Sequence, residues 1–453
     1  MTPLALLLLA WLQAPLPAAQ DSTPAGTAPA EEAPRVWSAQ ERAAIDLLRS
    51  LRSKERPSDD ELASRLSDRG EPLVPFFFDV LEARSVPAYD QSAPQKLSEI
   101  QENVILLALG QLDRNLVLSH VGSRMALGQE LEQRLAAIEC LGAVGHGNDF
   151  VAIFELALSP QELELERKLK PALQRAVTSI LERDPKAFEQ LTYLRRITRP
   201  ELLSTLVSAV GDMGDGRGLG FLSEVAYWHP KLILDVMCQV RLVGLSTVES
   251  VNDAMRVRLR PYIDEAQPGH CRAAIMALAT LKDYDSIGPM IALLKCEDTG
   301  LRENALWALR TLTGLALSPS QETWARWHQS ELAWLVRRKA GEFQLLRSND
   351  AAEVASALRS ILTHPLALDE LRSALPDLLR NRWPAIRVLA CHTLAELKAG
   401  ESVSKLVWAL EDPEPTVSKA AFEALHVLTG LELPADALAW QTATGTEPRS
   451  AEL

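Results

Sequence analysis

The sequence contains ALRTLTGLALSPSQETWARW at residues 308–327 and, 116 residues later, ALHVLTGLELPADALAWQTA at residues 424–443. Both stretches place Leu-Thr-Gly after an apolar helical pattern, and both place a Trp ten residues after the Gly, at Trp324 and Trp440. Similarity to itself at a fixed offset is the signature of a repeat protein. The two copies therefore predict a duplicated piece of architecture.

The similarity extends well beyond the quoted stretches. At the same offset the block from Arg272 onward aligns without a gap on the block from Val388 onward. Each block also has a shorter period of 31 residues, which takes Ala390, Leu394 and Leu397 to Ala421, Leu425 and Leu428. Apolar and small residues at this helical spacing mark one buried face of a helix, and a second such helix follows a short turn. Each unit is predicted to be a helix pair that must stack on its neighbours.

Two of these units resemble HEAT-type repeats. They are NRWPAIRVLACHTLAELKAG at 381–400 and DPEPTVSKAAFEALHVLTG at 412–430, with a Pro ahead of the first helix (Pro384, Pro415) and Ala at the packing position (Ala390, Ala421). The chain looks like an exported bacterial member of the HEAT-like group that includes the phycobilin (PBS) lyases. The resemblance implies an all-α fold, an αα-superhelix or HEAT/armadillo-like α-solenoid of stacked helix pairs. It covers about residues 95–440.

The remaining segments frame this array. Residues 1–19 are predicted to be a signal peptide, because Leu4–Leu12 form an apolar run too short to span a bilayer, followed by small residues at Ala18 and Ala19. We expect a Pro/Ala/Thr-rich disordered linker over 20–36, a divergent helical N-terminal cap over 37–94 and a disordered tail over 441–453. The expected location is periplasmic, envelope-associated or secreted, with no transmembrane span in the mature chain.

The composition and the net charge restrict the class of partner that we expect. The chain of 453 residues carries a net charge of −13, with 47% hydrophobic and 5% aromatic residues. A strongly acidic chain repels phosphate backbones, so nucleic acid is not expected as a partner. The short basic runs RVRLR (256–260) and RRK (337–339) are interpreted as solvated helix faces. The oligomeric state is left open.

The sequence shows no catalytic or cofactor constellation. The glycine-rich stretch Gly211–Gly220 follows a helical pattern, whereas a dinucleotide site needs a preceding strand, so we interpret it as a turn between helices. Eight scattered His and five Cys residues lack metal-ligand spacing, and the cysteines are interpreted mainly as buried small side chains. We expect no metal, no cofactor and no assignable catalytic residue, and the chain is interpreted as a binding protein in preference to an enzyme.

Tryptophans off the apolar stripes are the candidate binding residues. At 100° per residue, Trp307 lies opposite the stripe formed by Ala305, Ala308, Leu309 and Leu312. Trp408 lies off the stripe of its own helix in the same way. Each could pack between repeats or anchor a partner. Trp383 is interpreted as packing where a helix begins, and Trp324 as packing back onto the preceding pair.

The residues that precede Trp324 predict how its helix starts. We expect Ser318 to be the N-cap, with Pro319 in the first turn and Gln321 as the capping-box partner. In the second copy Pro434 and Ala437 replace two of these residues, so that copy is expected to lack a polar cap.

The function predicted from these features is an exported scaffold that binds another protein or peptide along its concave face. Two alternatives remain open. One is a lyase-like or chromophore- or ligand-handling HEAT protein, which needs a cleft with convergent polar groups. The other is a purely structural spacer, which needs only packing.

Overall fold

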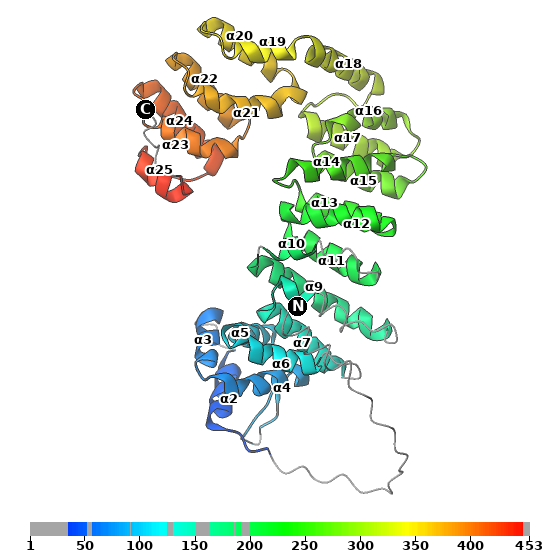
Figure 1. Cartoon of the computed structure of the whole chain (residues 1–453), viewed down its shortest axis with the longest axis vertical. Helices are drawn as coiled ribbons and strands as arrows, with labels where there is room; N and C mark the ends of the chain where they lie inside the picture. The colour runs from blue at the N-terminus through cyan, green and yellow to red at the C-terminus, as the bar shows by residue number, and fades with distance from the viewer. Residues whose placement is uncertain are drawn as a thin grey trace. The chain divides into compact units, whose positions relative to one another are not determined.

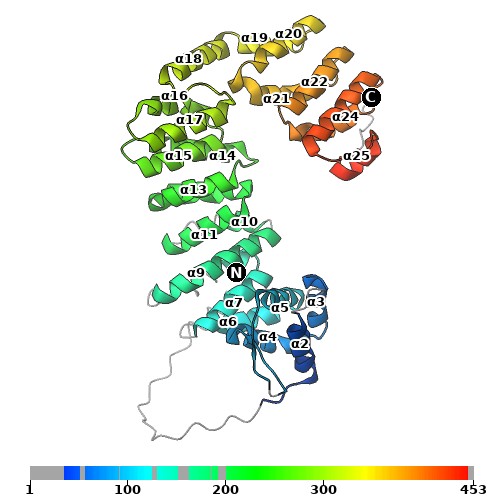
Figure 2. The ribbon, with the colours of Figure 1, turned by 180° about the vertical axis from the view of Figure 1, so that it is seen from behind.

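The computed structural model describes residues 35–51, 57–90, 92–124, 130–150, 163–184, 186–191 and 200–446. The chain divides into two compact units, Met1–Tyr262 and Ile263–Leu453. Both units are built from short helices stacked in pairs, which confirms the predicted all-α solenoid class (Figures 1 and 2). The expected signal peptide and nearly all of the expected linker lie outside the described residues.

In the first unit, helices stack in sequence order. α7 packs on α9, α9 on α11 and α11 on α13, while α12 packs on α14. A short antiparallel strand pair, β1 (Ser85–Val86) with β2 (Gln95–Lys96), connects α4 to α5. The helices are α2 (Ala39–Ser50), α3 (Asp59–Ser67), α4 (Val74–Ala83), α5 (Glu99–Gln111), α6 (Arg114–Arg124), α7 (Leu131–Val144), α9 (Leu163–Arg183), α10 (Ala187–Leu191), α11 (Pro200–Met213), α12 (Leu219–Trp228), α13 (Ile233–Val243) and α14 (Glu249–Leu259).

The glycine-rich stretch forms the turn between α11 and α12, as predicted. Gly214 adopts a left-handed conformation with φ of 59°, which costs Gly little because it has no Cβ. A single 3-10 turn, Gly216–Gly218, then leads into α12. A Cβ at position 216 would lie 2.0 Å from the carbonyl oxygen of Leu245, so close backbone packing also requires Gly there. The stretch is therefore a tight connection.

In the second unit, the predicted 116-residue offset relates two sets of helices. α15 packs on α17 in the first set, and α22 packs on α24 in the second. The helices are α15 (Pro268–Thr280), α16 (Ile287–Ala292), α17 (Thr299–Thr313), α18 (Gln321–Arg337), α19 (Lys339–Leu345), α20 (Ala351–Leu362), α21 (Leu368–Leu378), α22 (Pro384–Glu396), α23 (Val403–Ala409), α24 (Pro415–Thr429) and α25 (Ala437–Thr444).

The repeated stretch, residues 308–327 and 424–443, contains the end of one helix and the start of the next in both copies. Gly314 ends α17 and Gly430 ends α24, each in a left-handed conformation with φ of 70° and 68°. Trp324 and Trp440 are both wholly buried. Packing therefore explains why the Gly and the Trp recur together.

The predicted cap is wrong by two residues. Ser320, and not Ser318, is the N-cap of α18, and its hydroxyl accepts a hydrogen bond from the Thr323 backbone N–H. Pro319 precedes the cap, so it does not occupy the first turn. Asp436 caps α25 in the same way through the Ala439 N–H, so the second copy also keeps a polar cap. Each cap sits one residue before its helix begins, where a side-chain oxygen reaches a free N–H.

The chain after the second copy also differs from expectation. The tail was expected from residue 441, but α25 continues to Thr444 and ends at Gly445, which is left-handed with φ of 64°. Residues 447–453 lie outside the described part of the chain.

Polar contacts brace the second unit across several helices. The ammonium of Lys282, in the turn after α15, lies 2.9 Å from a carboxylate oxygen of Asp369 at the start of α21. The Tyr284 hydroxyl donates a hydrogen bond of 2.7 Å to the other oxygen. Burial would raise the pKa of Asp369, but the Tyr284 and Lys282 contacts outweigh it and hold that pKa below its usual range. One carboxylate thus joins segments 85 to 87 residues apart.

No single helix among the described residues is both long and apolar enough to cross a bilayer. The helices Glu99–Gln111 and Arg114–Gly122 reach that length and composition only when taken together, and they are bent by 120°.

Candidate partner-binding surfaces

Trp307 lies in a shallow groove on α17. Its neighbours on the buried stripe, Ala305, Ala308 and Leu309, are fully covered, while the indole is 43% exposed. The groove has a volume of about 450 Å³. It is lined by Glu303, Leu306, Trp307, Arg310 and Thr311. A partly exposed aromatic ring can bury apolar surface against a partner, and its few rotatable bonds keep the entropic cost small.

The second copy shows what the fold requires at this position. The 116-residue offset places Glu423 of α24 on Trp307 of α17. Glu423 is exposed, its carboxylate is 3.8 Å from the ammonium of Lys419, and α24 is otherwise packed like α17. The fold therefore accepts a solvated carboxylate where the first copy carries an indole. Packing gives no reason for Trp307.

Trp408 is placed differently. It lies on α23, is only partly exposed, and carries the Lys405 ammonium 4.1 Å from the centre of its ring. This cation–π contact already occupies one face of the indole. Trp408 does not line the groove of Trp307. Of the two candidate residues, Trp307 is the more exposed, and it lines a groove.

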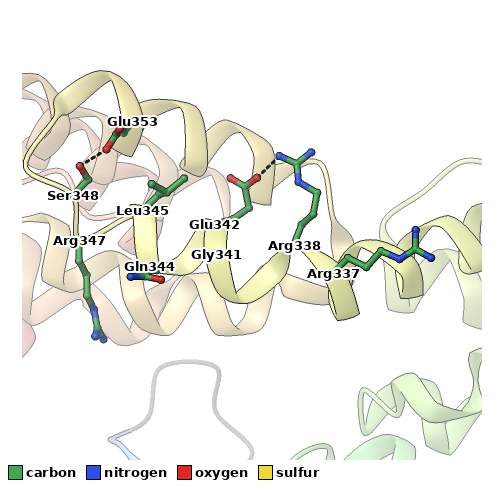
Figure 3. A pocket seen from close by; sticks show the side chains of 9 residues that line it. All are labelled: Arg337, Arg338, Gly341, Glu342, Gln344, Leu345, Arg347, Ser348 and Glu353. Atoms are coloured by element: carbon green, nitrogen blue, oxygen red, sulfur yellow. Dashed lines mark hydrogen bonds and ion pairs between the residues drawn. The ribbon is translucent and has the colours of Figure 1, made fainter.

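The sequence interpretation missed a larger groove on α18, α19 and α20 (Figure 3). Its volume is about 920 Å³. The lining residues are Arg337, Arg338, Gly341, Glu342, Gln344, Leu345, Arg347, Ser348 and Glu353. α19 follows α18 and precedes α20 in the chain, and it supplies four of the nine lining residues. The available signals were the RRK run and the loss of repeat similarity over 330–380.

Some of the charged side chains in this groove form ion pairs or hydrogen bonds with one another, and others do not. Arg338 donates a 2.6 Å hydrogen bond to Glu342, whose carboxylate is nearly buried, and Ser348 donates to Glu353. Arg337 and Arg347, at opposite ends of the lining in Figure 3, make no hydrogen bond or ion pair with a side chain in the described part of the chain. Both guanidinium groups are exposed.

The second unit also contains a carboxylate–imidazole pair, in which the carboxylate of Glu331 is buried and the imidazole of His364 is partly buried. Nδ1 of His364 is 2.7 Å from a carboxylate oxygen of Glu331, and the backbone N–H of Leu366 donates to the other oxygen. The imidazole stacks on Trp334 with ring centres 3.7 Å apart. Both carboxylate oxygens are used in joining α18 to the turn after α20, so the pair is explained by structure.

The two buried cysteines with a shifted pKa are not activated nucleophiles. All five are free, and Cys238 is exposed. Burial raises the pKa of Cys271 to about 11 and that of Cys391 to about 12. A thiol reacts as its thiolate, so these two are inert at neutral pH. The described residues also contain no group of three or more His, Cys, Asp or Glu that could hold a metal ion.

The first unit has an exposed aromatic pair that the sequence interpretation did not single out. Tyr227 and Trp228 end α12 with their rings edge to face, 4.9 Å apart, and both are more than half exposed. The Arg258 guanidinium lies 5.0 Å from the Tyr227 ring and donates to the Ser223 carbonyl. Part of the RVRLR run therefore holds an aromatic ring in place.

Comparison with known proteins identifies the repeat type. Residues 279–314, which extend from the end of α15 through α17, match the armadillo/beta-catenin-like repeat. No curated protein matches the sequence.

Solved structures with a similar succession of helices include an engineered protein, at 15% identity over 86% of this chain and 95% of that one, with a TM-score of 0.28. A Kap121p mutant aligns at 11% identity over 91% of this chain, with a TM-score of 0.38, and importin beta at 11% over 90%, with a TM-score of 0.34. The alignments cover 48% of Kap121p and 57% of importin beta, so the chain spans about half the length of each. Within the described residues, stacked helix pairs and the repeat match together place the fold in the HEAT/armadillo solenoid class.

Proposed function

We propose that this protein is an exported scaffold that binds another protein or peptide along the concave face of its helix array, with Trp307 as an anchor. Solenoids of this class are typical protein-binding scaffolds, because stacked helices present many side chains along one continuous surface. The groove of Trp307 contains only Glu303 and Arg310 as ionisable groups. It therefore lends no support to the lyase-like alternative, which needs convergent polar groups.

The observation that carries the proposal is the contrast between Trp307 and Glu423. Two helices with the same packing carry an exposed indole in one copy and a solvated carboxylate in the other. Exposing an indole costs solubility and gains nothing in packing, whereas the same ring is a typical centre of a binding hot spot. A purely structural spacer would have no use for it.

The test places a photo-crosslinking amino acid, benzoylphenylalanine, at position 307 in the full chain expressed in its own host. The same amino acid at position 423 is the matched control, because that site has the same place on the equivalent helix. We expect a discrete crosslinked species at 307 that is absent at 423, with the partner identified by mass spectrometry. Equal crosslinking at both positions, or none at 307, would overturn the proposal.

Export is a separate part of the proposal and has its own test. It is supported by the apolar run Leu4–Leu12 and the small residues that follow it. Sequencing the N-terminus of the protein recovered from the envelope or the medium should give a chain that starts near Gln20. A chain recovered from the cytoplasm with residues 1–19 intact would contradict export while leaving the crosslinking result unaffected.

A further inference from the structure

We infer that the groove on α18–α20 binds an acidic segment of a partner protein, with two carboxylates on Arg337 and Arg347 and an aliphatic side chain on Leu345. This inference rests on the proposed scaffold function and names the chemistry of one of its partners. It concerns a site that is separate from the residues lining the Trp307 groove.

The charge of the groove is the first step. In a chain with a net charge of −13, three of the nine lining residues are arginines. Arg338 is committed to the nearly buried Glu342, because that carboxylate would otherwise be left without a partner. Arg337 and Arg347 make no ion pair among the described residues, and both side chains are exposed (Figure 3). Two free guanidinium groups with rigid forks of donors favour carboxylate partners.

The spacing of the two arginines favours a peptide over a small anion. They flank α19, whose seven residues rise about 10 Å at about 1.5 Å per residue. A single phosphate or carboxylate cannot bridge that length. An extended peptide advances about 3.3 Å per residue, and its side chains point to the same side only when they are an even number of residues apart. Because the two arginines lie beyond both ends of α19, acidic side chains about four residues apart, with an aliphatic side chain midway between them, match the two guanidinium groups and Leu345.

The apolar part of the lining favours a protein over a nucleic acid. Leu345 lies between the two arginines in sequence, lines the same groove and is 39% exposed. It can cover an aliphatic side chain placed between the two acidic residues. A phosphate backbone would leave Leu345 uncovered and would meet the acidic remainder of the chain.

The experiment measures the fluorescence anisotropy of a fluorescein-labelled peptide, Gly-Gly-Glu-Ala-Leu-Ala-Glu-Gly-Gly, titrated with the full chain. A peptide with Gln in place of both Glu is the ligand control. The double variant Arg337→Glu/Arg347→Glu tests the groove. Arg326→Glu/Arg380→Glu is its matched control, because it makes the same change in net charge on exposed arginines of the same unit that do not line the groove.

We expect the Gln peptide and the groove variant each to weaken binding about tenfold or more, and the control variant to change it less than twofold. Binding should also weaken as salt is raised from about 50 to 300 mM. Equal binding of the Glu and Gln peptides, an equal loss in both double variants, or tighter binding of a labelled single-stranded oligonucleotide would overturn the inference. The scaffold proposal would survive such a result if crosslinking at position 307 still captured a partner.

Discussion

The two copies of the repeated block have the same core and different surroundings. In both, a left-handed Gly ends one helix and a fully buried Trp on the next helix covers the preceding pair. The helix that carries the Trp is seventeen residues long in the first copy and leads into α19, but eight residues long in the second, where Gly445 ends it. Buried positions kept in both copies are required for packing, and exposed positions that differ, such as Trp307 and Glu423, are available for function.

The buried tryptophans give the largest expected effect. Trp324→Ala and Trp440→Ala should each lower the free energy of unfolding by about 3–5 kcal/mol, because each leaves a large cavity between helices. Urea denaturation followed by circular dichroism measures the loss. Trp307→Ala is the control, since that ring is half exposed, and should cost below about 1 kcal/mol. A loss at Trp307 as large as at Trp324 would show that the exposed indole is required for packing.

The same two tryptophans differ in their hydrogen bonds. Nε1 of Trp440 donates a 2.9 Å hydrogen bond to the Pro434 carbonyl, whereas Nε1 of Trp324 is buried with no partner among the described residues. Replacement by Phe removes the N–H in both cases. Trp440→Phe should therefore cost about 1 kcal/mol more than Trp324→Phe, because only Trp440 loses a hydrogen bond. Equal losses in urea denaturation would mean that the N–H of Trp324 also finds a partner, such as a water molecule.

The ion pair between Asp369 and Lys282 predicts a pH-dependent difference in stability between the two copies. The equivalent lysine of the second copy, Lys398, has no carboxylate partner among the described residues. The folded protein lowers the pKa of Asp369, so its contribution to stability is fully present above about pH 4, the range of a free Asp. That contribution is lost as the pH falls through the lower, folded value.

Asp369→Asn should cost about 1 kcal/mol at pH 7, a value kept small by the partial exposure of the pair. The cost should shrink below pH 4. Asp377→Asn, on the same helix and exposed, is the control and should show no such trend. A cost at Asp369 that stays constant down to pH 3 would show that the ionised carboxylate is not what matters.

The sequence predicted the periodic parts of this molecule better than the exceptions to the period. The 31- and 116-residue repeats were sufficient to predict the helix pairs and the burial of Trp324, because helical periodicity fixes which face is covered. They placed Trp307 off the buried stripe but left open whether it packs between repeats or is exposed. The cap was placed two residues early, since Ser318, Pro319 and Ser320 all suit a helix start and only the backbone decides among them. The arginine groove was missed, because α19 has no counterpart in the repeat and its lining residues come from three helices.

The smallest expected effect concerns two lysines at equivalent turns. Lys282 and Lys398 both adopt the left-handed conformation, with φ of 53° and 52°, at a helix end where Gly is favoured. Lys398→Gly should raise the free energy of unfolding by about 0.5 kcal/mol by relieving this strain. Lys282→Gly relieves the same strain but loses the ion pair with Asp369, so its net effect should be close to zero or negative. Thermal denaturation of the two variants at pH 7 and again at a pH below the lowered pKa of Asp369 separates the two effects, because protonation of Asp369 then removes the ion pair and should bring the two gains together. If Lys282→Gly raises the free energy of unfolding as much as Lys398→Gly does at pH 7, the ion pair between Lys282 and Asp369 contributes nothing to stability.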